Sequence, residues 1–152
     1  MVRRAAGFTL VELMVTIAIL VLLLLTSLPF TASWIHSARA NEAKAKIIQG
    51  HGLAKALALR NPNKALVPGA AAGLKLDGLM LYVCSGNPAA ETCGAGKSAV
   101  TWQAVLLDNT EVSIGGATGT SQTLSIDNTG LPLSVATYSV TYRSESETGK
   151  LY

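Results

Sequence analysis

A chain of 152 residues is long enough for one domain with a real core, and too short for two domains plus a membrane segment. Its residues are 49% hydrophobic, 14% charged and 5% aromatic, and its mean hydropathy is +0.38, which is apolar for a soluble domain. The formal charge is only +3, so the composition does not indicate a nucleic-acid-binding protein.

The N-terminal part combines a short basic leader, residues 1–7, with an apolar run from Leu10 to Leu28. Glu12 is the only formally charged residue in that run. About this length is needed for a helix to cross the hydrocarbon core of a bilayer. Pro29 removes one backbone donor and crowds the preceding turn, which predicts a kink and not a stop. We therefore expect residues 8–30 to form a transmembrane helix that is kinked near Pro29.

Residues 31–59 are predicted to form an amphipathic continuation of the same helix. This segment is rich in alanine and carries scattered charges, and apolar residues recur in it at steps of three and four. These residues are Trp34, Ile35, Ala38, Ala45, Ile48, Gly52, Ala56 and Leu59. The string Arg60-Asn61-Pro62-Asn63 is a strong stop signal, because a residue before proline avoids the helical region and asparagine favours turns. The helix is thus expected to end near Leu59.

Residues 60–152 are predicted to form a β-rich domain. The segment from Val67 to Gly78 is rich in Gly, Ala and Pro and is interpreted as a loop, and Gly115 to Gly119 as a hairpin turn. The intervening runs of β-branched and aromatic residues predict a small antiparallel sheet. They are residues 79–84, 99–107, 111–114, 122–126 and 133–143. The expected fold is α+β: a long N-terminal helix packed on a C-terminal antiparallel β-sheet domain, with the outer half of the helix forming one wall of the core.

Two cysteines, Cys84 and Cys93, follow the apolar run. The basic pair Arg3 and Arg4 is expected to hold the N-terminus in the cytoplasm, so that everything after the span is exported. A disulfide persists in that environment. We therefore expect a Cys84–Cys93 disulfide, and two free buried thiols are the alternative.

An ordinary secretory signal peptide is the first alternative for the N-terminus. An A-x-A pattern exists at Ala38-Arg39-Ala40, but it lies well past the apolar run and contains an arginine, and Glu12 interrupts the run near its start. Twin-arginine export is the second alternative, and only the Arg3-Arg4 pair supports it. Both alternatives fit the sequence less well than a segment that stays in the membrane.

The string GFTLVEL, Gly7 to Leu13, resembles the processing site of type IV pilins and type II secretion pseudopilins. The resemblance implies that a prepilin peptidase cuts between Gly7 and Phe8 and methylates the new amine of Phe8. Glu12 would then be the fifth residue of the mature chain, and Pro29 matches the usual kink position of the family. A carboxylate in hydrocarbon costs a few kcal/mol unless it is neutralised or paired. The resemblance implies that Glu12 pairs with the amine of a neighbouring subunit during assembly; a glutamate favoured only by the helix dipole is the alternative.

The pattern V-C-S-G-x5-T-C-G-x7-W, which contains Cys84, Cys93 and Trp102, points to a subgroup. Together with IDNTGL at residues 126–131 and the closing GKL, it resembles the minor-pilin group that includes FimT, FimU and the H-type pseudopilin of type II secretion. This implies a minor pilin that primes a type IV pilus or caps it, supporting pilus biogenesis and twitching motility, or else an H-type minor pseudopilin. The implied partners are other pilins or pseudopilins, the prepilin peptidase and the inner-membrane assembly platform. The implied location is the inner membrane, with the globular domain in the periplasm, and then the pilus or pseudopilus.

Other functions find weaker support in the sequence. The tail from Gly149 to Tyr152 has one lysine beside Glu145 and Glu147, which is a poor patch for binding DNA phosphates. His36 and His51 have no third ligand at metal-binding spacing, and no nucleophile motif surrounds the serines. We therefore expect no enzyme activity, no cofactor and no metal. The remaining basic cluster, on the predicted helix, is interpreted as a solvated face or a subunit contact: Lys44, Lys46, Lys55 and Arg60.

Overall fold

The computed structural model describes residues 7–151 and leaves out the side chains of residues 27–32. Within these residues, helix α1 (Leu10–Arg60) precedes seven strands, and the chain divides into two compact units, Met1–Ile35 and His36–Tyr152. The strands are β1 (Ala72–Asp77), β2 (Met80–Ser85), β3 (Val100–Val105), β4 (Thr110–Ile114), β5 (Ser121–Ile126), β6 (Thr137–Tyr142) and β7 (Glu145–Lys150).

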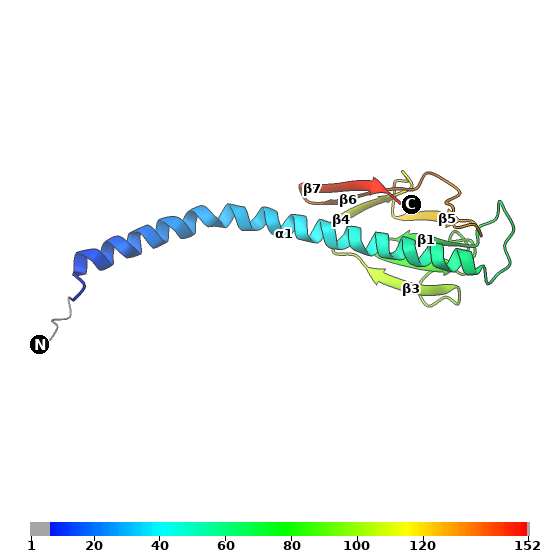
Figure 1. Cartoon of the computed structure of the whole chain (residues 1–152), viewed down its shortest axis with the longest axis horizontal. Coiled ribbons are helices and arrows are strands. Elements are labelled where there is room, and N and C mark those ends of the chain that lie inside the picture. The colour runs from blue at the N-terminus through cyan, green and yellow to red at the C-terminus, as the bar shows by residue number, and fades with distance from the viewer. Residues whose placement is uncertain (1–6, 152) are drawn as a thin grey trace, which may run out of the picture. The chain divides into compact units, whose positions relative to one another are not determined.

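The second unit contains two antiparallel sheets beside the second half of α1 (Figure 1). The larger sheet has the order β3-β2-β1-β5, and the smaller has the order β4-β6-β7. Every strand pair in both sheets is antiparallel. The predicted α+β fold, a helix packed on antiparallel sheets, is therefore confirmed.

Two strands lie where the sequence did not predict them. The segment interpreted as a loop from Val67 to Gly78 contains β1, which lies inside the larger sheet with β2 on one side and β5 on the other. Gly73 in β1 packs so closely that a Cβ there would lie 2.5 Å from the Leu124 carbonyl oxygen and 2.5 Å from Pro88 Cγ. The glycine that suggested a loop is thus required by close packing within a sheet. The second missed strand is the polar β7, which forms one of the two edges of the smaller sheet.

The predicted hairpin turn at Gly115 to Gly119 is wrong. Strand β4 pairs with β6 and strand β5 pairs with β1, so this segment connects the two sheets. The Gln122 side chain joins the sheets at the same place: its Oε1 accepts from the Ile114 amide at 2.7 Å, and its Nε2 donates to the Val112 carbonyl at 2.7 Å. A buried amide side chain thus supplies hydrogen bonds that a hairpin partner would have made.

The face of α1 that enters the core differs from the one marked by the large apolar residues. The core-facing residues are small apart from Ile47 and His51: Ala40, Ala43, Ile47, Gly50, His51, Ala54 and Ala58 are all buried. Trp34, Ile48 and Leu59, which were part of the predicted apolar face, are 73%, 47% and 58% exposed. The helix does form one wall of the core, but it does so with its alanine face.

Gly50 marks the closest approach of α1 to the larger sheet. A Cβ at this position would lie 3.0 Å from Leu74 Cδ2 and 3.1 Å from Trp102 Cζ3, which is tighter than ordinary contact. Leu74 is fully buried and Trp102 packs against the same core. The absence of a side chain at Gly50 therefore sets how near the helix lies to the sheet.

The C-terminus of α1 is fixed by Asn61. This residue has a left-handed φ of 44°, and its amide donates to the Leu57 and Ala58 carbonyls. Its side chain holds the chain that follows, because Oδ1 accepts from the Ala65 amide at 2.7 Å and Nδ2 donates to the Ala65 carbonyl at 2.8 Å. The predicted stop thus occurs at Arg60, one residue after the expected end.

Cys84 and Cys93 form the expected disulfide, with Cα atoms 5.7 Å apart. Both are buried in a small cluster with Tyr82, separate from the main core. The Lys75 ammonium donates to the Cys93 carbonyl at 2.8 Å and holds the far end of the enclosed loop. The loop between β2 and β3 is therefore closed covalently and tied to β1 by a hydrogen bond.

His51 lies on the core side of α1 and is only 4% exposed. Its Nε2 atom is buried and has no hydrogen-bond partner among the described residues. Burial, with a smaller contribution from the Lys55 ammonium, holds the pKa of His51 below its ordinary value. The folded protein therefore disfavours protonation of this imidazole.

Gly50→Leu is expected to lower the free energy of unfolding by about 1–3 kcal/mol, because the new side chain would overlap Leu74 and Trp102. The matched control is Gly52→Leu, at an exposed helical position with open space around it. The control should be neutral or more stable by up to about 1 kcal/mol, because leucine favours helix over glycine. Urea denaturation of both variants in detergent measures the difference, and equal effects would contradict the proposed close approach.

Folding stability is expected to fall as the pH drops below about 6.5. In that range His51 binds a proton in the unfolded state but not in the folded state, where its pKa is lower, so acid favours unfolding. The slope cannot exceed about 1.4 kcal/mol per pH unit for one group. The pKa of Asp127 is also lowered, chiefly by the Thr129 hydroxyl, but that stabilisation is lost only at more acidic pH. Denaturation between pH 7 and pH 5 should therefore show a slope that His51→Gln reduces. An unchanged slope in the variant would exclude His51 as its source.

Candidate processing and assembly site

The Gly7–Phe8 bond lies in non-helical chain ahead of α1. Gly7 is exposed, with nothing within 4 Å of the position a Cβ would take, and Phe8 is 79% exposed. Neither residue belongs to a helix or strand. The bond is therefore open to a protease cleft that binds extended chain. The leader residues before Gly7, including Arg3 and Arg4, lie outside the described residues.

Thr9 caps the N-terminus of α1. Its Oγ1 accepts a hydrogen bond from the Glu12 amide at 3.2 Å, and its carbonyl accepts one from the Leu13 amide at 3.2 Å. The Thr-x-x-Glu spacing is that of a capping box. Sequence reasoning missed this cap, although the spacing just before the apolar run could have shown it. Because Thr9 follows Phe8, a cut at Gly7–Phe8 leaves the capping residue in the mature chain.

Glu12 lies in the first turn of α1 and is exposed. The helix N-terminus carries partial positive charge, which favours a carboxylate at this position. No ion pair or hydrogen bond to the Glu12 carboxylate is present among residues 7–151 as described. Its charge is thus available to a group outside this part of the chain.

The first half of α1 exposes large apolar side chains on all sides, among them Leu13, Ile17, Leu20 and Leu24. Its hydroxyls bond to the helix itself: Thr16 Oγ1 donates to the Leu13 carbonyl at 2.8 Å, and Thr26 Oγ1 donates to the Leu23 carbonyl at 3.0 Å. Glu12 is therefore the main polar side chain that this stretch presents to its surroundings.

In the part of the chain that the structure describes, no helix is both long and apolar enough to cross a membrane.

The backbone of residues 27–32 is helical, but their side chains, including Pro29, are outside the described set. The kink expected at Pro29 therefore stays a prediction.

The second half of α1 has an exposed face with little charge, which we call the outer stripe. Its members lie at steps of three, four or seven residues, so they occupy one side of the helix. They are Ala38, Ala45, Ile48, Gly52, Ala56 and Leu59, all of them exposed. The alanine face enters the core, so this half of α1 presents apolar surface both to its own sheets and to the outside.

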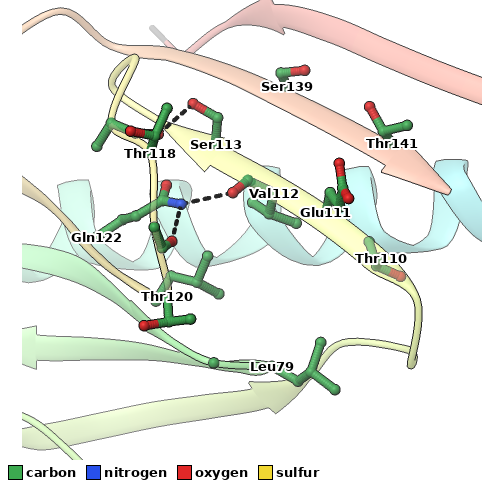
Figure 2. A pocket seen from close by; sticks show the side chains of 14 residues that line it. Leu79, Thr110, Glu111, Val112, Ser113, Thr118, Thr120, Gln122, Ser139 and Thr141 are labelled. Atoms are coloured by element: carbon green, nitrogen blue, oxygen red, sulfur yellow. Dashed lines mark hydrogen bonds between the residues drawn. The ribbon is translucent and has the colours of Figure 1, made fainter.

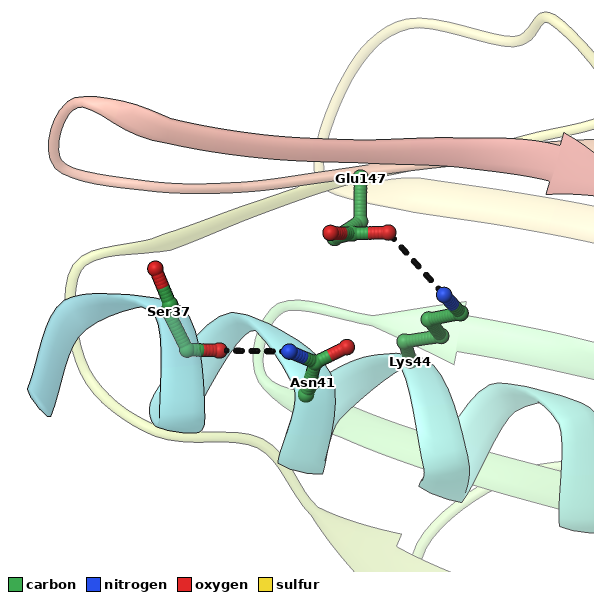
Figure 3. A network of polar contacts seen from close by, with 4 residues as sticks. All are labelled: Ser37, Asn41, Lys44 and Glu147. Carbon is green, nitrogen blue, oxygen red and sulfur yellow. Dashed lines mark hydrogen bonds and ion pairs between the residues drawn. The ribbon is translucent and has the colours of Figure 1, made fainter. Parts of the chain in front are cut away.

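The basic residues of α1 are partly engaged in ion pairs. Lys44 Nζ lies 2.9 Å from Glu147 Oε2 on β7, and this hydrogen bond raises the pKa of Lys44 (Figure 3). Lys46 Nζ lies 2.7 Å from Glu42 Oε1 and also donates to the Val105 carbonyl at 2.9 Å. Two of the four lysine and arginine side chains in the predicted basic cluster are therefore bonded within the chain and poorly placed to bind phosphates.

The two histidines do not come together. The His36 ring packs 5.8 Å from the Tyr142 ring centroid, whereas His51 is buried further along α1. Arg39 Nη1 donates to the Tyr142 hydroxyl at 2.5 Å, and this bond lowers the pKa of Tyr142. Among the residues that were described, no group of three or more His, Cys, Asp or Glu side chains could hold a metal ion.

The IDNTGL segment forms a tight loop after β5. Asp127 Oδ1 accepts hydrogen bonds from the Thr129 amide, the Thr129 hydroxyl and the Leu131 amide at 2.9, 2.6 and 2.9 Å. At Gly130, a Cβ would lie 3.2 Å from the Leu59 side chain, so the loop packs on the end of α1. The IDNTGL string therefore forms a hydrogen-bonded loop that packs on the end of α1.

Comparison with known families finds a match to the prokaryotic N-terminal methylation motif over residues 2–28. The matched range contains Gly7, Phe8 and Glu12. The chain matches no curated protein and no solved structure. It therefore carries the N-methylation motif of type IV pilins and pseudopilins on an α+β, pilin-like fold. That motif implies processing by a prepilin peptidase, inner-membrane anchoring and entry into a pilus-type assembly, and proteins that carry it are generally structural and not enzymes.

Proposed function

We propose that this protein is a minor pilin of a type IV pilus, a non-enzymatic structural subunit that primes assembly or caps the filament and so supports pilus biogenesis and twitching motility. The observation that carries the proposal is the two-faced second half of α1. Its alanine face is buried against the sheets of the same chain, whereas the outer stripe remains exposed. Apolar surface of this kind, continuous with a membrane-type segment, fits packing against the helices of other subunits.

The proposed life cycle begins in the inner membrane, with the first half of α1 in lipid and the second unit in the periplasm. The exposed apolar side chains of that half and its self-bonded threonine hydroxyls support this placement. The disulfide agrees with an oxidising compartment. The prepilin peptidase then cuts between Gly7 and Phe8, and the N-methylated amine of Phe8 supplies the positive charge that pairs with Glu12 of a neighbouring subunit during assembly.

The H-type minor pseudopilin of a type II secretion system is the alternative. It shares the Cys84, Cys93 and Trp102 pattern and would use the same helix chemistry with different partners. A DNA-binding pilin for natural transformation is less well supported, because Lys44 and Lys46 are paired with Glu147 and Glu42. Co-purification of the mature protein with pilus subunits or with secretion pseudopilins distinguishes the first two functions.

Processing is tested by the mass and N-terminal sequence of the mature protein. We expect the mature chain to begin at Phe8 with one added methyl group. Gly7→Val should block the cut, because the protease cleft that holds the extended chain would have no room for the larger side chain at this position. Gly52→Val is the control, since it changes an exposed glycine far from the cleavage site. A mature chain that begins elsewhere, or normal cleavage of the Gly7→Val protein, would refute the assignment.

The role of Glu12 is tested by comparing membrane insertion with filament incorporation. Glu12→Ala should remain in the membrane fraction, because it makes the apolar run more apolar, yet its recovery in sheared filaments should fall about tenfold or more as the charge pair is lost. Val11→Ala is the matched control at the neighbouring exposed position. Normal incorporation of the Glu12→Ala protein would remove the assembly role from this residue.

A further inference from the structure

A groove of about 550 Å³ lies on the outer face of the smaller sheet, the face turned away from α1 (Figure 2). Alternate residues of β4 and β6 form its floor: Glu111 is opposite Thr141, and Ser113 is opposite Ser139. The loop of residues 117–120 and the turn between β1 and β2 at Leu79 form its walls. A second hollow of about 370 Å³ shares Thr110, Glu111 and Thr141 with it and extends the groove to Arg143.

Six of the fourteen residues that line the larger hollow carry a hydroxyl group, and Glu111 is its only charged side chain. Among the described residues that line the two hollows, Arg143 of the second is the one cation, so the groove as a whole has no excess of positive charge to attract the phosphates of a nucleic acid. The lining residues described include no aromatic ring on which a sugar or a base could stack. A ligand with amide groups and one positive charge is the chemistry that these side chains complement.

The groove is held in shape by internal hydrogen bonds. Gln122 Nε2 donates to the Val112 and Gly119 carbonyls, both at 2.7 Å, and Ser113 Oγ donates to the Ala117 carbonyl at 2.8 Å (Figure 2). These bonds join the loop and the start of β5 to β4. The walls are therefore preorganised, which lowers the entropy cost of binding.

Thr110 supplies an unused polar group at the junction of the two hollows. The residue is only 8% exposed, and its Oγ1 is buried without a hydrogen-bond partner among the described residues. Such orphaned groups are uncommon in folded proteins and often await a ligand or a water. Glu111, beside it, is exposed and forms no ion pair in the described part of the chain.

Strand β4 forms the other edge of the smaller sheet, opposite β7. Gln122 bonds this edge at the Val112 carbonyl and the Ile114 amide, and the Thr110 amide donates to the Leu107 carbonyl at 3.2 Å. The Thr110 carbonyl and the Val112 amide therefore remain as the groups that this end of the edge offers to an added strand. An extended chain can add to such an edge through backbone hydrogen bonds, with alternate side chains entering the adjoining pockets. Edge and groove thus favour the same kind of ligand.

We propose that this groove binds an extended peptide segment of a partner protein, with a lysine or arginine side chain of that segment paired to Glu111. The site belongs to the second unit alone and does not depend on the assembly role of α1. It gives the β-rich domain a recognition function of its own.

The test uses the isotopically labelled full chain in detergent micelles and three pools of capped pentapeptides. The pools carry Lys, Gln or Glu at the centre and random Val, Thr, Ser and Ala at the other positions. We expect the Lys pool to shift the amide resonances of residues 110–113 and 139–141, with an apparent affinity at least about fivefold above that of the Gln pool. The Glu pool should bind most weakly.

Two variants and one control make the test specific. Glu111→Gln should remove the preference for the Lys pool, and Thr110→Val should weaken all pools without loss of folding stability, because it removes an unpaired hydroxyl. Glu91→Gln, an exposed acidic residue in the disulfide loop, should bind as the parent does. The proposal is overturned if the Lys pool leaves these strands unshifted, if Glu111→Gln retains the preference, or if a neutral oligosaccharide mixture shifts the same resonances more strongly than the peptides.

Discussion

The close packing of α1 against two sheets through small side chains is the constraint on which the rest of this structure depends. At Gly50 the sheet side chains Leu74 and Trp102 come so near that even a methyl group would crowd them. Ala43, Ala54 and Ala58 continue the same contact. A helix that buries its small residues must place its larger ones elsewhere, and Ile48 and Leu59 accordingly face outward. The placement of small residues on one side of α1 and larger apolar residues on the other therefore accounts for both the tightly packed core and the exposed apolar surface.

This arrangement links stability to assembly. The second unit is closed by its own disulfide, by the Gln122 bridge between its sheets and by the Asp127 loop on the end of α1. It can therefore keep its shape while the outer stripe remains available to a partner. At the other end of the chain, Thr9 caps the helix without using the Glu12 carboxylate, so the cap and the charge serve separate purposes. A helix with a stable start, a free charge and an unused apolar face fits a subunit that is stored in a membrane and later packed among other helices.

The sequence predicted the features that depend on local chemistry. The methylation motif, the long helix and its end near Leu59, the Cys84–Cys93 pair and the Val- and Tyr-rich strands were all predicted from short patterns. Two strands were missed because tertiary contacts override their composition. Strand β1 contains Gly73, which close packing requires, and β7 is polar because it forms an edge and reaches α1 through Glu147. The buried face of α1 could not be told from the sequence because alanine occurs on every side of this helix, and the larger apolar residues belong to the exposed outer stripe instead. The groove depends on a contact between two sheets, which no local pattern reveals.

The most direct test of the central claim is site-specific photo-crosslinking from the second half of α1 in assembled filaments. A photoreactive phenylalanine derivative at Ile48, on the outer stripe, should crosslink efficiently to the α1 helix of another pilin subunit. The same group at Val105, an exposed apolar residue on β3 and not on α1, should crosslink to that helix several-fold less. Equal crosslinking from both positions, or crosslinks from Ile48 only within its own chain, would contradict the account.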